Sequence, residues 1–305
     1  MSTVPLSIII PTHNEELNLP DCLRSLAGWA DEVWIVDSYS TDRTLEIARE
    51  FGAQVVQRVY DGPATQKNWA LDNLAFRNAW ILILDADERL TPELRDEISC
   101  IVTAGESANN GYYINRRFMF YGKWIRHCGW YPSWNLRLFR RGHGRYEERR
   151  IHEHLLLDGR AGYCRHDMIH EDRRDISFWI QKHDRYSTHE AWENLQTLRG
   201  MEQSGVRPSF FGNAIERKRA IRDRVWIRLP ALVRSLLFFV YMYVFRLGFL
   251  DGVQGLHFCH MHAVYQFFYA IKLWELKHYK EGAPEGGINT GKAADEKVEQ
   301  AAAPR

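Results

Sequence analysis

The regular alternation of short apolar runs and helical stretches in the first hundred residues constrains the fold of this 305-residue chain more than any other feature. Each apolar run is short enough for a buried strand, and apolar side chains recur at helical spacing between the runs. Strands are predicted at residues 6–10, 32–36, 53–58 and 80–84, and helices over 15–28, 65–78 and 92–102. This order predicts an α/β fold with a mostly parallel sheet covered by helices.

Polar segments directly follow three of these predicted strands, at residues 11–15, 37–40 and 85–87. Ligands of such sheets bind beyond the carboxyl ends of the strands. Asp37 is placed to accept hydrogen bonds from a base imide or from ribose hydroxyls, whereas Asp42 is better placed to cap the next helix.

The string Asp85-Ala86-Asp87 follows the fourth predicted strand. Two carboxylates at this spacing can hold one divalent cation together with a diphosphate, as Mg²⁺ prefers. The alternative is an ordinary loop or helix cap, in which such strings are common, but the position at a strand end favours the metal site.

Composition narrows the classes of function. The formal net charge of +1 argues against a general nucleic-acid binder. Five scattered cysteines without a C-x-x-C pair fit a reducing compartment, and the N-terminus has no signal-peptide pattern, so we expect a cytoplasmic protein. A zinc site is disfavoured because no cysteine has suitable spacing to the histidines.

Three regions are expected along the chain: a catalytic domain over 1–175, a helical region over 176–281 and a disordered tail over 282–305. Within the first, residues 111–170 change to short strands and resemble a small mixed sheet that completes the site. Within the second, residues 215–250 join a basic stretch to an aromatic one. That composition is typical of a helix on an anionic membrane surface, with a core helix as the alternative.

Four motifs together resemble family 2 glycosyltransferases of the GT-A fold, which is Rossmann-like and binds nucleotides: PTHNEE, VDSYSTDRT, GPATQKNWAL and ILDADERL. The resemblance covers residues 6 to about 170. More narrowly, LDADERLTPEL, WNLRLFRRG followed by IHE, and GFLDGVQGL resemble lipopolysaccharide-core glucosyltransferases of the WaaE type. His13 and Ser38 depart from the common pattern at positions expected to meet the base.

The resemblance implies roles for individual residues. Lys67 and Asn68 would reach the base or the diphosphate, and Asp85 would approach both the ribose and the metal. Asp87 would ligate Mg²⁺ or Mn²⁺ directly, with His170 as a further candidate at the metal or diphosphate. The residues implied to line the uridine are Pro11, His13, Glu15 and Asp37.

Inverting transfer also needs a general base and an acceptor site. Family position favours Glu153 as the base, with Glu171 and Asp172 as alternatives. Trp130 and Trp134 offer aromatic faces for a sugar, although they could equally pack the core. Arg137 could bind acceptor phosphates or lie on a solvated face.

The sequence therefore predicts an inverting, metal-dependent glycosyltransferase. Its expected donor is a UDP-hexose, most simply UDP-glucose, and its acceptor a lipid-linked saccharide at the cytoplasmic face of the inner membrane, where the protein would bind peripherally. The alternatives are transfer to an O-antigen, exopolysaccharide or polyprenyl-phosphate acceptor, a nucleotide-sugar-binding protein without activity, and a nucleotidyltransferase. The last would need a glycine-rich basic loop where this chain has PTHNEE.

Overall fold

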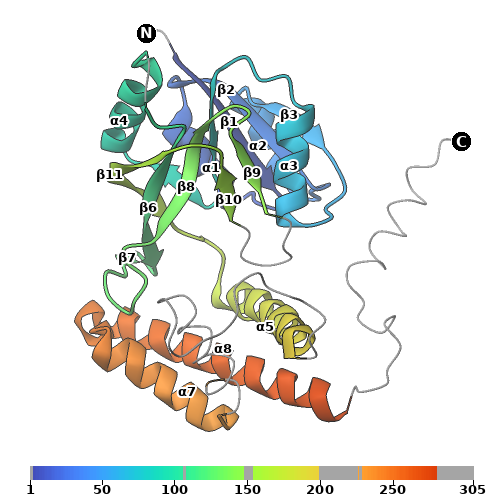
Figure 1. Cartoon of the computed structure of the whole chain (residues 1–305), viewed down its shortest axis with the longest axis vertical. Helices are drawn as coiled ribbons and strands as arrows, with labels where there is room; N and C mark the ends of the chain where they lie inside the picture. Colours follow the sequence, from blue (N-terminus) through green and yellow to red (C-terminus); the bar gives the residue numbers. More distant parts are fainter. Residues whose placement is uncertain (1–2, 106–107, 148–153, 199–225, 227–228, 280–305) are drawn as a thin grey trace, which may run out of the picture.

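The computed structural model describes residues 3–105, 108–147, 154–198, 226 and 229–279 (Figure 1). The predicted tail 282–305, Glu153 and nearly all of the basic stretch lie outside them. The elements of the sheet region are β1 Val4–Thr12, α1 Leu19–Leu26, β2 Ala30–Asp37, α2 Thr44–Glu50, β3 Gln54–Gln57, α3 Pro63–Asn73, β4 Trp80–Ile83, β5 Glu88–Leu90, α4 Pro92–Thr103, β6 Gly111–Phe120, β7 Lys123–Trp124, β8 Trp134–Arg140, β9 Gly144–Tyr146, β10 Leu155–Leu157 and β11 Ala161–His170.

One nine-stranded mixed sheet forms the centre of this region, with its main path in the order β3-β2-β1-β4-β8-β6-β11-β5. Strands β3, β2, β1 and β4 are parallel, which confirms the alternation predicted from the sequence. Strand β8 is antiparallel to both β4 and β6, and β11 is parallel to β6. The second half is therefore mixed, as predicted for 111–170. A separate hairpin joins β9 and β10.

Alternation along β1 builds a hydrophobic core on each face of the sheet. Ile8 and Ile10 face a core that α1, α2 and α4 complete, whereas Ile9 faces a second core completed by α3. Successive strand residues point to opposite faces, so a strand covered on both sides must be apolar throughout. This explains why the run at 6–10 contains almost no polar residue.

The start of α4 is set by a helix cap, and the start of α1 is set by the loop before it. The side chain of Thr91 accepts a hydrogen bond from the backbone N–H of Leu94, and Pro92 follows in the first turn of α4. The helix predicted over 15–28 begins only at Leu19, because residues 13–17 form the loop that follows β1. The helical spacing of the apolar residues in 15–28 does not show that the first of these residues belong to a loop.

The C-terminal elements are α5 Ile176–Leu198, α7 Ala231–Val240, the π-helical turn η2 Tyr241–Phe245, the 3-10 turn η3 Gly248–Asp251 and α8 Gly252–His278. They form a helical layer below the sheet in Figure 1, where α8 lies between α5 and α7. Phe258 of α8 packs against Phe118 and Phe120 of β6, so an aromatic cluster joins the two layers. In the described part of the chain, no single helix has the length and composition of a membrane span. Taken together, α7–η2 and η3–α8 have that length and composition, but the two parts are bent by 73° relative to each other.

Candidate active site

The loops that follow β1 and β2 meet at the carboxyl edge of the sheet, as predicted. The hydroxyl of Thr12 donates to the carboxylate of Asp37 over 3.0 Å. Nδ1 of His13 lies 2.9 Å from the carbonyl oxygen of Ser38. Pro11 pairs with Val36 in the ladder between β1 and β2, next to these residues. Pro11 and His13, which are both predicted to line the uridine, therefore lie at the same edge.

Asp37 has a different environment from the one expected of an exposed ligand-binding carboxylate. Its side chain is fully buried. Its carboxylate accepts hydrogen bonds from Thr12, from the backbone and hydroxyl of Ser40, and from Gln57. Asp37 thus holds the two loops together, and its contact with a nucleotide stays a prediction.

Lys67 and Asn68 lie in α3 but face different surroundings. The ammonium of Lys67 lies 3.8 Å from a carboxylate oxygen of Asp85. The amide of Asn68 donates to the carbonyl of Tyr146 over 2.9 Å and accepts from its N–H over 2.8 Å. Asn68 therefore fixes β9 to α3, and its contact with a nucleotide stays a prediction.

The turn after β4 presents Asp85 at the sheet edge. The backbone N–H of Asp85 donates to Glu88 over 3.0 Å, and the N–H of Glu88 donates to the carbonyl of Asp85 over 2.9 Å. Arg137 donates to both carboxylates, over 2.6 Å to Asp85 and 2.7 Å to Glu88. Burial alone would raise the pKa of Asp85, but Arg137 and Lys67 outweigh it and hold that pKa well below its usual range. The Asp85 side chain stays 37% exposed, so a ligand can reach it.

Asp87 lies beside His170, the last residue of β11. The carboxylate and Nε2 are 3.4 Å apart, and the N–H of Glu171 donates to the carbonyl of Asp87 over 2.9 Å. Burial opposes charge on both groups, yet their mutual attraction prevails: the pKa of Asp87 is lowered and that of His170 is raised. The raised pKa of His170 favours its charged form beside Asp87, so the two side chains are placed as an ion pair.

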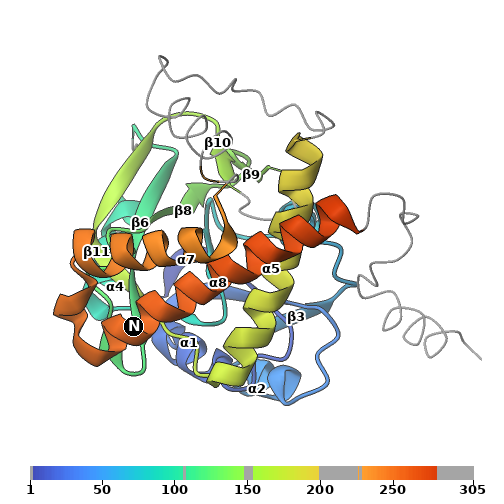
Figure 2. The same ribbon diagram turned by 90° about the horizontal axis from the view of Figure 1, so that it is seen from below.

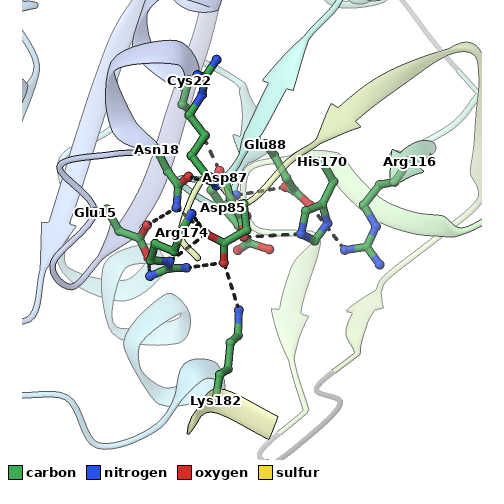
Figure 3. Close-up of polar contacts among 12 residues, drawn as sticks. Glu15, Asn18, Cys22, Asp85, Asp87, Glu88, Arg116, His170, Arg174 and Lys182 are labelled. Carbon is green, nitrogen blue, oxygen red and sulfur yellow. Dashed lines mark hydrogen bonds and ion pairs between the residues drawn. The ribbon is translucent and has the colours of Figure 1, made fainter. Parts of the chain in front are cut away.

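A second set of charges faces the same turn (Figure 3). Arg174 donates to Asp172 over 2.7 Å and to Glu15 over 3.1 Å. Burial raises the pKa of Glu15 to about 7, although Arg174 opposes this. The ammonium of Lys182, from α5, lies 3.9 Å from Asp172. Burial opposes the charge of Lys182, but the nearby Asp87 raises its pKa, so the ammonium stays charged beside the turn.

The donor set fits a divalent cation that is shared with a ligand. Among the described residues, no group of three or more His, Cys, Asp or Glu side chains is arranged around one metal position. Asp85 and Asp87 supply two carboxylates, and Mg²⁺ or Mn²⁺ commonly takes its other ligands from diphosphate oxygens and water. The predicted metal assignment is therefore chemically consistent with this turn, provided that the nucleotide completes the coordination.

Arg137 does not lie on a solvated face, because only 5% of the residue is exposed. The pairing of β6 with β8 runs Tyr112–Leu138 and then Tyr113–Leu136, so Arg137 is the extra residue of a β-bulge. Bulges redirect side chains, and here the guanidinium reaches the carboxylates of the turn. Its predicted contact with acceptor phosphates stays a prediction.

Replacing Arg137 by methionine is expected to lower the free energy of unfolding by about 3 kcal/mol, because the buried Glu88 and the partly exposed Asp85 both lose the guanidinium that bridges them. Urea denaturation measures this free energy, and EDTA removes any bound cation that would compensate the charge of the two carboxylates. Arg140, also in β8, stacks over Trp80 and serves as the matched control. Arg140→Met should cost about 1 kcal/mol or less. Equal losses in the two variants would contradict the proposed role of Arg137.

The remaining predicted residues are placed as follows. Trp130 is partly buried and packs edge-on against Phe258 and His262 in the aromatic cluster. Trp134 is 40% exposed and lies against Tyr163. Glu153 lies outside the described residues, so its role as base stays a prediction.

Sequence comparisons identify the family. The sequence model of Glycosyl transferase family 2 matches residues 7–148. The lipopolysaccharide core biosynthesis glycosyltransferase LpsC of Rhizobium meliloti (strain 1021) is 32% identical over 215 residues, which cover 68% of this chain and 76% of that protein. The chain belongs to glycosyl transferase family 2. Its mixed, mostly parallel sheet with covering helices is accordingly a GT-A-like fold.

Other known proteins match over a smaller part of the chain or at lower identity. An uncharacterized glycosyltransferase of Rickettsia bellii is 43% identical over 112 residues, which cover 37% of this chain and only 36% of that protein. Among solved structures, S. aureus TarS 1–349 has a TM-score of 0.44 and 14% identity, covering 89% of this chain and 91% of that one. Glucosyl-3-phosphoglycerate synthase of Mycobacterium tuberculosis, solved with Mn²⁺ and UDP-glucose, has a TM-score of 0.30 and 21% identity, covering 37% and 43%. These two structural likenesses are too distant to define a substrate.

The structure adds residues to the site that sequence reasoning missed. Sequence reasoning gives no role to Arg174 or Glu88. Their approach, like that of Lys182, depends on β11 and α5 reaching the same edge as β4. The density of charges in residues 170–175 was the one available signal, but it does not reveal which pairs form.

Proposed function

We propose that this family 2 enzyme transfers a hexose, glucose in the first instance, from a UDP-sugar to a lipopolysaccharide-core saccharide with inversion at the anomeric carbon. The observation that carries the proposal is the Asp85–Asp87 turn at the sheet edge, next to the cations Lys67 and Lys182. The likeness to LpsC, which is a lipopolysaccharide core biosynthesis enzyme, supports this acceptor class.

The arrangement suits the loss of a charged leaving group. As the acceptor oxygen attacks, the bond to UDP breaks and negative charge grows on the diphosphate. Lys67 and Lys182 are positioned to attract that charge without reorganisation during the reaction. A divalent cation bound by Asp85, Asp87 and the diphosphate would act there as a Lewis acid. Glu153 is proposed to take the proton of the acceptor hydroxyl.

A lipid-linked acceptor also implies a place of action. We propose that the enzyme works at the cytoplasmic face of the inner membrane and attaches to it peripherally. The rival acceptors, an O-antigen, an exopolysaccharide or a polyprenyl phosphate, would require the same donor site. A protein without activity is disfavoured because Asp85 and Asp87 both remain at the sheet edge.

A donor screen tests the proposal. UDP release is measured with a panel of nucleotide sugars and a delipidated core acceptor, with and without EDTA. UDP-glucose should give the highest turnover, and EDTA should reduce it to background until Mn²⁺ or Mg²⁺ is restored. Transfer that persists in EDTA would contradict metal dependence. Transfer from another UDP-sugar would revise only the donor.

A further inference from the structure

Helix α7 presents an apolar outer face and buries its one charged residue, unlike an ordinary surface helix. Arg234 is only 1% exposed and lies 4.8 Å from the ring of Tyr269 of α8. By contrast, Leu232 is 73% exposed and Leu236 is 63% exposed. A surface helix in water normally turns its apolar side chains to the core and its charges outwards. The outer face of α7 therefore fits an apolar environment.

The exposed apolar surface continues beyond α7 through the bend into α8. We call the outward-facing apolar side chains of residues 232–253 the apolar elbow; Phe245, at 74% exposed, and Leu250, at 54%, extend it beyond α7. Between residues 231 and 253, all of them described, Arg246 is the one exposed charged residue. An exposed apolar patch of this length is unusual for a surface that stays in water.

Basic side chains border the elbow at one edge. Lys123 of β7 lies beside Gly252, and Arg246 lies beside Gly129. Arg126 stacks over Trp124, with 4.6 Å between the guanidinium carbon and the ring centroid. The nearby acid Asp251 is buried and accepts hydrogen bonds from the backbone N–H groups of residues 126 and 127. The edge of the elbow is therefore positively charged, which suits anionic lipid headgroups.

The orientation of the helical layer relates the elbow to the active site. Lys182 of α5 reaches the carboxylates at the sheet edge, so the site faces the helical layer. In Figure 1, α7 lies further from the sheet than α8, which contacts the sheet through Phe258. The elbow and α5 therefore belong to one helical layer, because α8 packs against both α7 and α5 (Figure 2).

We propose that the apolar elbow inserts into the headgroup region of an anionic bilayer, with α7 and the start of α8 lying along the membrane surface. The 73° bend and the lack of a single spanning helix among the described residues favour lying along the surface over crossing it. In this orientation a lipid-linked acceptor would reach the site, and that consequence rests on the proposed function. A second copy of the chain is the rival occupant, but the basic edge formed by Lys123, Arg126 and Arg246 favours an anionic lipid surface over it.

Vesicle co-sedimentation of the full chain tests the proposal. The variant Leu236→Asp/Phe245→Asp changes two exposed elbow residues, and Val59→Asp/Leu156→Asp changes two residues exposed elsewhere to 52% and 58%. On vesicles of phosphatidylcholine with phosphatidylglycerol, the elbow variant should bind at least about tenfold more weakly than the wild type. The control variant should bind like the wild type. Lys123→Gln/Arg126→Gln should weaken binding to these vesicles but not to phosphatidylcholine alone.

Two outcomes would overturn the assignment. One is equal vesicle binding by the wild type and the elbow variant while both remain folded by circular dichroism. The other is a wild type that does not bind vesicles and forms a dimer that the elbow variant dissociates. Failure of the proposed function is distinguishable, because it would abolish UDP release with every donor and leave vesicle binding intact. Transfer to the delipidated acceptor should be unchanged in the elbow variant.

Discussion

Asp87→Ala is expected to lower kcat for sugar transfer by at least about a thousandfold, or about 4 kcal/mol of transition-state stabilisation. Asp87 is the carboxylate predicted to bind the cation directly, and it lies in the turn between β4 and β5, beside His170 at the end of β11. Its loss would leave negative charge on the departing diphosphate without its main counter-charge. Steady-state UDP release with saturating Mn²⁺ measures the effect.

The fold should survive this change, since no hydrophobic core residue is removed. Circular dichroism and the melting temperature would verify this. Asp158→Ala is a suitable control, because its side chain is 89% exposed and lies in the loop before β11. It should leave kcat unchanged. If Asp87→Ala retained wild-type, EDTA-sensitive turnover, the assignment of the metal to Asp87 would be wrong.

Glu153→Gln is expected to lower kcat by about a hundredfold to ten-thousandfold while the affinity for the UDP-sugar changes little. The amide cannot accept the proton of the acceptor hydroxyl, but it preserves size and polarity. The measurement is kcat together with the KM for the donor and a direct titration of UDP binding.

The alternative bases provide the matched comparison. Glu171 forms an ion pair with Arg89, and Asp172 accepts two hydrogen bonds from the guanidinium of Arg174. Burial would raise the pKa of Asp172, but its bonds to Arg174 lower it, which makes the carboxylate a weaker base. Asp172→Asn and Glu171→Gln should therefore reduce kcat less than Glu153→Gln. Unaltered turnover in Glu153→Gln with a large loss in either rival would transfer the role of base to that rival.

Much of the sheet could be predicted because it depends on local patterns. The buried run in β1 alternates between two hydrophobic cores, and this requires continuous apolar residues that are easily recognised. The position of Asp85 and Asp87 follows from the strand before them and from the parallel order of β1, β2 and β4. These inferences needed only side-chain period and the general location of ligand sites in parallel sheets.

Roles that depend on contacts between distant segments could not be predicted. The sequence predicts that Asn68 reaches the nucleotide, and only the structure shows that both sides of its amide bind the backbone of Tyr146. Arg234 falls within the segment 215–250 whose basic residues suggest an exposed surface, yet this residue of α7 is buried against Tyr269 of α8. Both residues are polar, and composition alone treats a polar residue as available to solvent or ligand.

The sequence by itself determined the strand and helix order, the carboxyl-edge loops and the aspartate pair, because each is encoded by neighbours within a few residues. Only the tertiary structure decided that Arg137 reaches Asp85 from a bulge in β8, that Lys182 approaches from α5, and that the outer face of α7 is apolar. The physical reason is that a charged or apolar side chain takes its role from the groups that surround it. Those groups come from segments tens of residues away in the chain.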